Sequence, residues 1–348
     1  MWQSDFQYYL AVESVDGESI GDVRLDVDWI PALRWAEFEQ NVRNQRALNG
    51  CGTSPVIEPV WNPEREPPYV GGVTIRDYEP GAEATPFTLT YFSDAVTKAS
   101  AELVASGALA TGQPFEYKIY ALAQAKPRDP VSWEIDIVAL DELPPIQSVE
   151  LAPLMADAEI NTNIAVRRSS DRTPTMPIFI PQSVLDEATD LARNVGDIET
   201  GGILVGTLCR DPDGTLYSKV TAQIPAEHTT ATRESLRFHH ATWVSVDAAI
   251  RLRNLGEIPL GWWHAHPFFC EHCPSERRSL CPFSIPKFSV ADRGVHREVF
   301  QKSWSVALLL SFLGAEQPSY DLFGWNQGQI EAMPFITLPD RAAIKENH

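Results

Sequence analysis

Apolar and polar residues alternate in short runs through the first 150 positions. Such alternation is typical of strands that bury one face, and Val15-Asp16-Gly17 between the first two runs indicates a hairpin. The predicted strands are 6–13, 21–29, 72–78, 86–92, 115–122 and 133–140. Helical spacing predicts helices at 32–48 and 94–106, and the proline-rich stretch 55–68 predicts a loop. We therefore expect an α+β domain at residues 1–150, to which the residues themselves assign no function.

The second half carries longer apolar segments. Leu185, Ala188 and Leu191 recur at helical spacing after Ser183, a suitable N-cap, and Gly196 ends that helix. The other predicted helices are 242–255 and 292–301, and the predicted strands are 199–206, 216–225, 258–264, 304–312, 320–325 and 332–337. These elements indicate a second α+β domain, of the α/β three-layer type, at residues 175–348, and the polar stretch 151–174 is expected to be a linker.

Net charge differs sharply between the two halves of the chain. The total is −19, and residues 1–160, with 26 acidic and 10 basic side chains, carry −16 of it, against −3 for the rest. An acidic surface disfavours nucleic acid and anionic membranes, which have the same sign of charge. Such a surface either binds a basic protein partner at the N-terminal domain or serves only to keep the protein in solution.

Composition places the chain among globular proteins of a reducing compartment. A hydrophobic content of 44% is ordinary for such proteins, and no apolar run approaches the eighteen or so residues that cross a bilayer. The first residues lack the basic and then apolar pattern of a signal peptide. Five cysteines, three of them clustered, do not indicate a disulfide framework. We therefore expect a cytoplasmic protein.

The strongest chemical signal is His264-Ala265-His266-Pro267 at the end of an apolar strand. Residues i and i+2 of a strand point to the same face, so both imidazoles can reach one ion. Asp292 offers a carboxylate as a third ligand. Two histidines and one acid leave a fourth position to water, as in catalytic rather than structural zinc sites.

Two further motifs accompany this pair: Glu199-Thr200-Gly201-Gly202 at the start of a strand, and Ser289-Val290-Ala291-Asp292. With them, roughly residues 175–335 resemble the JAMM (MPN+/JAB) zinc metalloproteases, whose pattern is a strand-borne Glu, then H-x-H-P, then S-x-x-D. All five positions are filled, by Glu199, His264, His266, Ser289 and Asp292. The chain departs from the pattern in the 22 residues, 267–288, between the second histidine and the serine, where family members have a shorter segment.

The resemblance implies a C-terminal MPN/JAB-like domain that hydrolyses an amide without a covalent intermediate. His264, His266 and Asp292 would hold a catalytic zinc ion, Glu199 would be the general base, and Ser289 would hydrogen-bond the carbonyl oxygen under attack. Ser289 could also be no more than the N-cap of the helix that contains Asp292. The other histidines, His228, His239, His240 and His296, are expected to be non-catalytic.

The insertion at 267–288 holds a cysteine cluster, Cys270-Glu271-His272-Cys273 followed by Cys281. The first pair has zinc-knuckle spacing, which predicts a second, structural zinc site. His272 is the nearest candidate for a fourth ligand, with Cys209, His239 and His240 as alternatives from elsewhere. The other interpretation is a loop with thiols that bind no metal.

Family members characteristically cleave the bond after the C-terminal glycine of a ubiquitin-like protein. The resemblance thus implies a peptidase or isopeptidase that deconjugates or processes such a protein, similar to enzymes of bacterial ubiquitin-like systems, some of them linked to antiviral defence. Two alternatives remain open: a non-catalytic MPN-type interaction scaffold, and a hydrolase of a small adduct on a sulfur-carrier protein.

Overall fold

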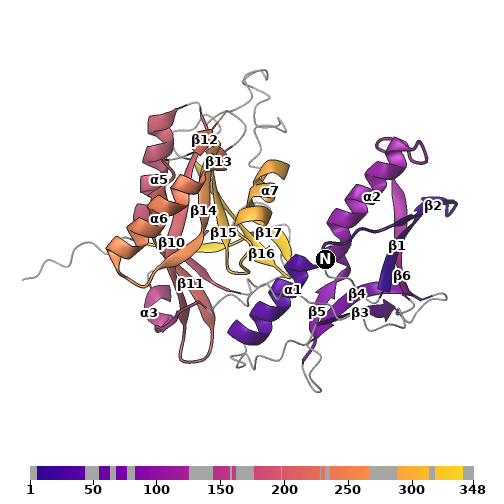
Figure 1. Ribbon diagram of the computed structural model, residues 1–348, viewed down its shortest axis with the longest axis horizontal. Helices are drawn as coiled ribbons and strands as arrows, with labels where there is room; N and C mark the ends of the chain where they lie inside the picture. Colours follow the sequence, from indigo (N-terminus) through magenta and orange to yellow (C-terminus); the bar gives the residue numbers. More distant parts are fainter. Residues whose placement is uncertain are drawn as a thin grey trace, which may run out of the picture. The chain divides into compact units, whose positions relative to one another are not determined.

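Helices and strands alternate through the computed structural model, so the fold belongs to the α+β class, as the sequence pattern predicts (Figure 1). The structure describes residues 6–43, 55–62, 68–76, 83–124, 144–156, 159–161, 176–196, 198–227, 229–231, 236–266, 288–312 and 318–339. The chain divides into two compact units: residues 1–142 with 327–329, and residues 143–326 with 330–348. None of the helices in the described ranges is long and apolar enough to cross a membrane.

The first unit contains two antiparallel sheets, in the orders β2-β1-β6 and β3-β4-β5, within the residues described. Its strands are β1 Phe6–Ser14, β2 Ser19–Arg24, β3 Val56–Asn62, β4 Tyr69–Arg76, β5 Thr85–Thr88 and β6 Phe115–Ala123. Its helices are α1 Ile30–Glu37, which continues as a π-helical segment Phe38–Arg43, a 3₁₀ turn Leu89–Phe92, and α2 Ser93–Ala105. The expected strand at 133–140 lies outside the described residues.

Aromatic side chains fill the core of the first unit. The Trp29 and Tyr91 rings stack with centroids 5.6 Å apart, and Tyr8 and Phe92 pack against them. The expectation of a loop at 55–68 is wrong for its first part, because Val56–Asn62 is strand β3. Pro59 is tolerated there because β3 is an edge strand in the described sheet, and an edge strand can do without one N–H donor.

One sheet of ten described strands forms the second unit, in the order β17-β16-β15-β14-β10-β11-β9-β18-β8, with β7 paired to the end of β10. The strands are β7 Ile146–Ser148, β8 Glu159–Asn161, β9 Ile178–Pro181, β10 Thr200–Arg210, β11 Leu216–Pro225, β14 Ile258–His266, β15 Val306–Ser311, β16 Ser319–Asn326, β17 Gln329–Met333 and β18 Phe335–Leu338. A separate hairpin joins β12 Thr229–Ala231 to β13 Leu236–Phe238. The helices are α3 Ala152–Met155, α5 Gln182–Val195, α6 His240–Arg253 and α7 Val290–Val299.

Helices α5 and α7 lie on opposite sides of the central strands (Figure 1). Side chains of β14 alternate accordingly: the Trp263 indole donates to Gln223, which reaches Glu187 of α5, whereas the Trp262 indole donates to His296 of α7. The central strands β10 and β14 are buried on both faces, which explains their nearly continuous apolar sequences.

Two segments of the second unit differ from the sequence expectations. The stretch 151–174, expected as a linker, contains α3 and also β8, which pairs with β18. The single strand expected at 332–337 is two strands, β17 and β18, separated at Pro334, and β18 pairs with β9 rather than continuing beside β16. Proline interrupts a strand because it cannot donate to the ladder.

Candidate metal centre

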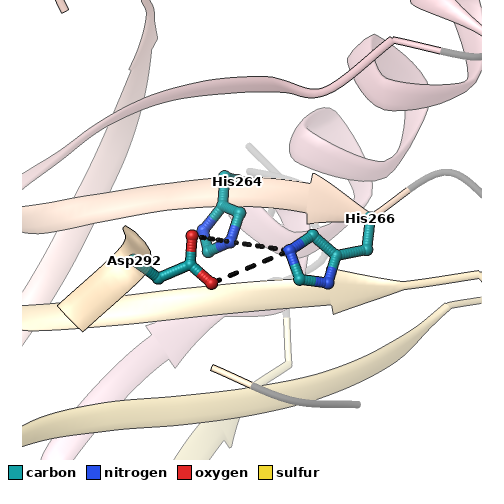
Figure 2. Close-up of side chains that lie close together, drawn as sticks. All are labelled: His264, His266 and Asp292. Atoms are coloured by element: carbon teal, nitrogen blue, oxygen red, sulfur yellow. Dashed lines mark hydrogen bonds and ion pairs between the residues drawn. The ribbon is translucent and has the colours of Figure 1, made fainter. Parts of the chain in front are cut away.

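Strand β14 presents two histidines to the same face of the sheet. His264 is fully buried, and the side chain of His266, at the end of the strand, is 25% exposed. Their Nε2 atoms lie 3.2 Å apart. Figure 2 shows both rings and the carboxylate of Asp292 pointing toward one another.

Helix α7 supplies the carboxylate through its first turn. Ser289 is the N-cap, and its hydroxyl accepts from the backbone N–H of Asp292 at 3.1 Å, while Oδ2 of Asp292 accepts from the backbone N–H of Ser289 at 2.7 Å. This capping box satisfies two helix-end donors and holds Asp292 in one orientation. The carboxylate lies 3.3 Å from Nε2 of His264 and 3.8 Å from Nε2 of His266.

The three side chains form a compact donor set. The ligand atoms of His264, His266 and Asp292 all lie within 4.8 Å of one another, and the group could hold a metal ion. Two nitrogen lone pairs and a carboxylate facing one point repel each other unless a cation lies between them or a proton is shared. The group is therefore chemically suited to a cation.

Glu199 reaches the same place from the neighbouring strand. It immediately precedes β10, where Gly201 is paired with His264, and its Oε1 lies 3.6 Å from Nε2 of His266. The residue is only 4% exposed. A Cβ atom at Gly201 would collide with the carbonyl oxygen of Trp263 and the side chain of Leu236, so glycine is required for this close approach of the two strands.

The surroundings of Asp292 and His266 favour the ionised carboxylate and the uncharged imidazole, the forms of these two side chains that bind a cation. Burial of Asp292 alone would raise its pKa, but the hydrogen bond and charge of His264 and the N–H of Ser289 together hold the pKa well below its usual range. Burial, followed by the charge of His264, lowers the pKa of His266 to about 4 despite the opposing effect of Asp292. At neutral pH the structure thus offers a carboxylate and an uncharged His266 imidazole.

The cysteine cluster Cys270, Cys273 and Cys281 and its neighbour His272 lie outside the described residues, so the second zinc site stays a prediction. All three alternative ligands, Cys209, His239 and His240, are described. Cys209 is buried in an apolar cluster with Phe179 and Tyr217, and Nε2 of His239 lies 2.7 Å from the hydroxyl of Thr230. His240 is the first residue of α6, and none of the three belongs to the group formed by His264, His266 and Asp292.

Sequence reasoning overlooked the surroundings of His296, which was expected to have no part in catalysis. This residue is fully buried on α7, four positions after Asp292, and it accepts a hydrogen bond from the indole of Trp262. Burial lowers the pKa of His296 to about 3, so the ring is neutral. The available sequence signal was the spacing of four, which places both side chains on one face of the helix.

Comparisons with known proteins give little guidance. The sequence matches no model of a protein family and no curated protein. Among solved structures, it is similar to the solution structure of protein DSY2949 from Desulfitobacterium hafniense, at 20% identity over 49% of this chain and 99% of that chain, with a TM-score of 0.34. A likeness at this level defines neither fold nor function.

Proposed function

We propose that the protein is a zinc-dependent peptidase or isopeptidase with an MPN/JAB-like domain in residues 175–348. The observation that carries the proposal is the convergence of two histidines and one aspartate from β14 and α7, with Oε1 of Glu199 3.6 Å from His266. Three protein ligands with a separate acid beside them are typical of catalytic zinc sites, which keep one position open.

The residues fit zinc in donor type and spacing. Tetrahedral zinc with bonds of about 2.0–2.2 Å to nitrogen and oxygen has its ligand atoms roughly 3.3–3.6 Å apart. The two Nε2 atoms are 3.2 Å apart, and His264 Nε2 is 3.3 Å from Oδ1 of Asp292. Calcium and magnesium instead prefer six or more oxygen ligands. The two imidazoles therefore favour zinc over these ions.

Zinc, when bound, supplies a water of pKa about 7 and a Lewis acid for the carbonyl. Glu199 would take the proton of the attacking water and pass it to the leaving amine. The Ser289 hydroxyl oxygen accepts from Asp292, which leaves its own hydrogen able to donate to the carbonyl oxygen under attack. His264, His266 and Asp292 would hold the ion and would not be consumed in the reaction.

The proposed substrate is the amide after the C-terminal glycine of a ubiquitin-like protein, in a conjugate or a precursor. This choice is supported by the resemblance of the five motif residues to JAMM enzymes. The acidic residues 1–160 are proposed to bind a protein partner, because their net charge of −16 favours a basic surface. A cytoplasmic location agrees with the clustered cysteines.

Elemental analysis of the purified protein tests the metal. Wild-type chain should contain zinc, and His264→Ala should contain one zinc fewer. A fall from two to one would also support the predicted cysteine site, whereas a fall from one to none would leave residues 267–288 without zinc. Folded wild-type protein that holds no zinc, prepared without chelator, would contradict the proposal.

A second experiment tests the reaction. The probes are ubiquitin-like proteins that carry an amide-linked coumarin after the C-terminal glycine. Hydrolysis of at least one probe is expected, and Glu199→Gln should retain zinc while losing about 10²–10⁴-fold in turnover, the range for a general base. A zinc-loaded protein that binds the probes but hydrolyses none would favour the scaffold alternative.

A further inference from the structure

The ring of His264 is held by stacking. Trp262, two residues earlier on β14, lies almost parallel to it, with ring centroids 4.6 Å apart and an interplanar angle of 13°. Histidine ligands usually donate their second N–H to a hydrogen-bond acceptor that fixes the ring plane. Among the described residues, however, no atom pairs with the buried Nδ1 of His264. The indole face is therefore the main described contact that restrains the imidazole plane.

The indole itself is oriented by one polar contact in apolar surroundings. Phe300 stacks with Trp262 at 5.8 Å and 11°, and Phe238 meets it edge-on at 5.8 Å. The flat contact with Phe300 allows the indole to slide within its plane. The hydrogen bond from Nε1 of Trp262 to Nδ1 of His296, 3.2 Å long and buried, fixes the position in that plane.

Packing holds the ring of His296 in place, so the acceptor of the Trp262 hydrogen bond has a defined position. Its ring packs against Trp325 at 5.4 Å and Phe300 at 6.1 Å, and it is fully buried on α7. The ring is neutral because burial lowers its pKa to about 3, so Nδ1 keeps its lone pair for the indole N–H. The same helix carries Asp292 one turn earlier.

We propose that His296 is a positioning residue of the metal centre: by accepting the Trp262 N–H it fixes the indole, which in turn fixes the plane of His264 toward the ion. One helix thus delivers both the carboxylate ligand and the contact that orients the histidine on the neighbouring strand. The inference rests on the metal binding in the proposed function, and it does not depend on the substrate.

The test compares variants that keep or remove the acceptor. His296→Leu removes it, whereas His296→Asn places an amide oxygen where Nδ1 lies. Zinc affinity is measured by competition with a chromophoric chelator, and ligand geometry by the visible spectrum of the cobalt-substituted protein. We expect His296→Leu to weaken zinc binding about 10- to 100-fold, the range for residues that orient a ligand, and to alter the cobalt bands. His296→Asn should restore most of the affinity and the wild-type spectrum.

Thr189→Val serves as the matched control for lost stability. It removes the hydrogen bond between Thr189 on α5 and the hydroxyl of Tyr320, a contact that involves neither Trp262 nor His296. Its zinc affinity and cobalt spectrum should equal those of the wild type even though the protein is less stable. A control that shifted both readouts as His296→Leu does would overturn the inference.

Trp262→Phe provides a second route if His296→Leu does not fold. It keeps an aromatic face for His264 and loses the N–H, so it should weaken zinc binding in the same way. The double variant Trp262→Phe/His296→Leu should bind zinc no more weakly than either single variant does. Unchanged affinity in Trp262→Phe, or additive losses in the double variant, would contradict the inference. Failure of the wild type to bind zinc or cobalt would instead refute the metal centre as a whole.

Discussion

Ser289 has an observed role as the N-cap of α7 and a proposed role in catalysis, and substitution can separate the two. Its hydroxyl caps α7 and is also proposed to donate to the carbonyl oxygen of the substrate. Ser289→Ala should lower the free energy of unfolding by about 1 kcal/mol, whereas glycine caps almost as well as serine. Turnover should fall by about 10²–10³-fold in both Ser289→Ala and Ser289→Gly, with zinc retained, because each lacks the hydroxyl.

Denaturant unfolding and hydrolysis of the coumarin probes measure the two effects. A Ser289→Gly protein with wild-type turnover would leave the serine as a cap alone. Equal losses of stability in the two variants would show that its hydroxyl contributes through something other than the cap.

At the scale of single residues, the sequence predicted which side chains come together but not what orients them. The spacings H-x-H and S-x-x-D are local, and strand and helix geometry convert them directly into facing side chains. The contact between Trp262 and His296 joins residues 34 positions apart. A tryptophan that only fills the core and one that orients a ligand occur in the same apolar strand pattern. The sequence therefore could not distinguish these two roles for Trp262.

At the scale of helices and strands, the buried carboxylate of Glu257 links α6 and the start of β14 to β11 through hydrogen bonds. Glu257 accepts two hydrogen bonds from Arg253 at 2.7 and 2.9 Å and a third from Thr221. The bond from Arg253 lowers the pKa of Glu257, and that effect, with the bond from Thr221, outweighs the opposing effect of burial. The residue is 5% exposed. This arrangement fixes the loop that leads into the strand of the two histidines.

Glu257→Gln should therefore destabilise the protein at neutral pH by about 1.5–3 kcal/mol, the range for hydrogen bonds to charged groups. Because the folded pKa lies below the unfolded one, this stability is present above the unfolded pKa and is lost as the pH falls through the folded pKa. Urea unfolding of both proteins at pH 7 and at pH 3 measures the difference, which should shrink at the lower pH. A difference that grows on acidification would show that the carboxylate is not stabilised by its ion pair.

Elements defined by local signals were predicted well. Helix α5 ends at Gly196, which has a φ of +80°, and β11 has the expected bounds 216–225. The errors have two sources: prolines in an edge strand, and pairing with a distant segment. Strand β3 was expected as a loop because of the prolines in and around it, and β18 pairs with β9, more than 150 residues earlier in the chain. Neither an edge position nor a long-range parallel pairing produces a pattern among neighbouring residues of the sequence.

For the whole molecule, the boundaries of the second unit matter for any shortened chain. Strand β7 pairs with β10 and β8 pairs with β18, so residues before 170 belong to the same sheet as the metal centre. A chain of residues 143–348 should fold and bind zinc as the full chain does. Residues 170–348 lack both strands and should have a lower thermal midpoint. Thermal unfolding with zinc analysis of both chains measures this, and equal midpoints would show that β7 and β8 add no stability.

The candidate metal ligands come from two elements, with 25 residues between His266 and Asp292. An ion bound by both would close that segment into a loop, so its free energy of binding would be added to the free energy of folding. Folding would then depend on mass action: free zinc at 100 times its dissociation constant stabilises the folded chain by about 2.7 kcal/mol. Wherever the ion is scarce, the chain would be both inactive and easier for proteases to degrade, so zinc supply would govern its abundance as well as its activity.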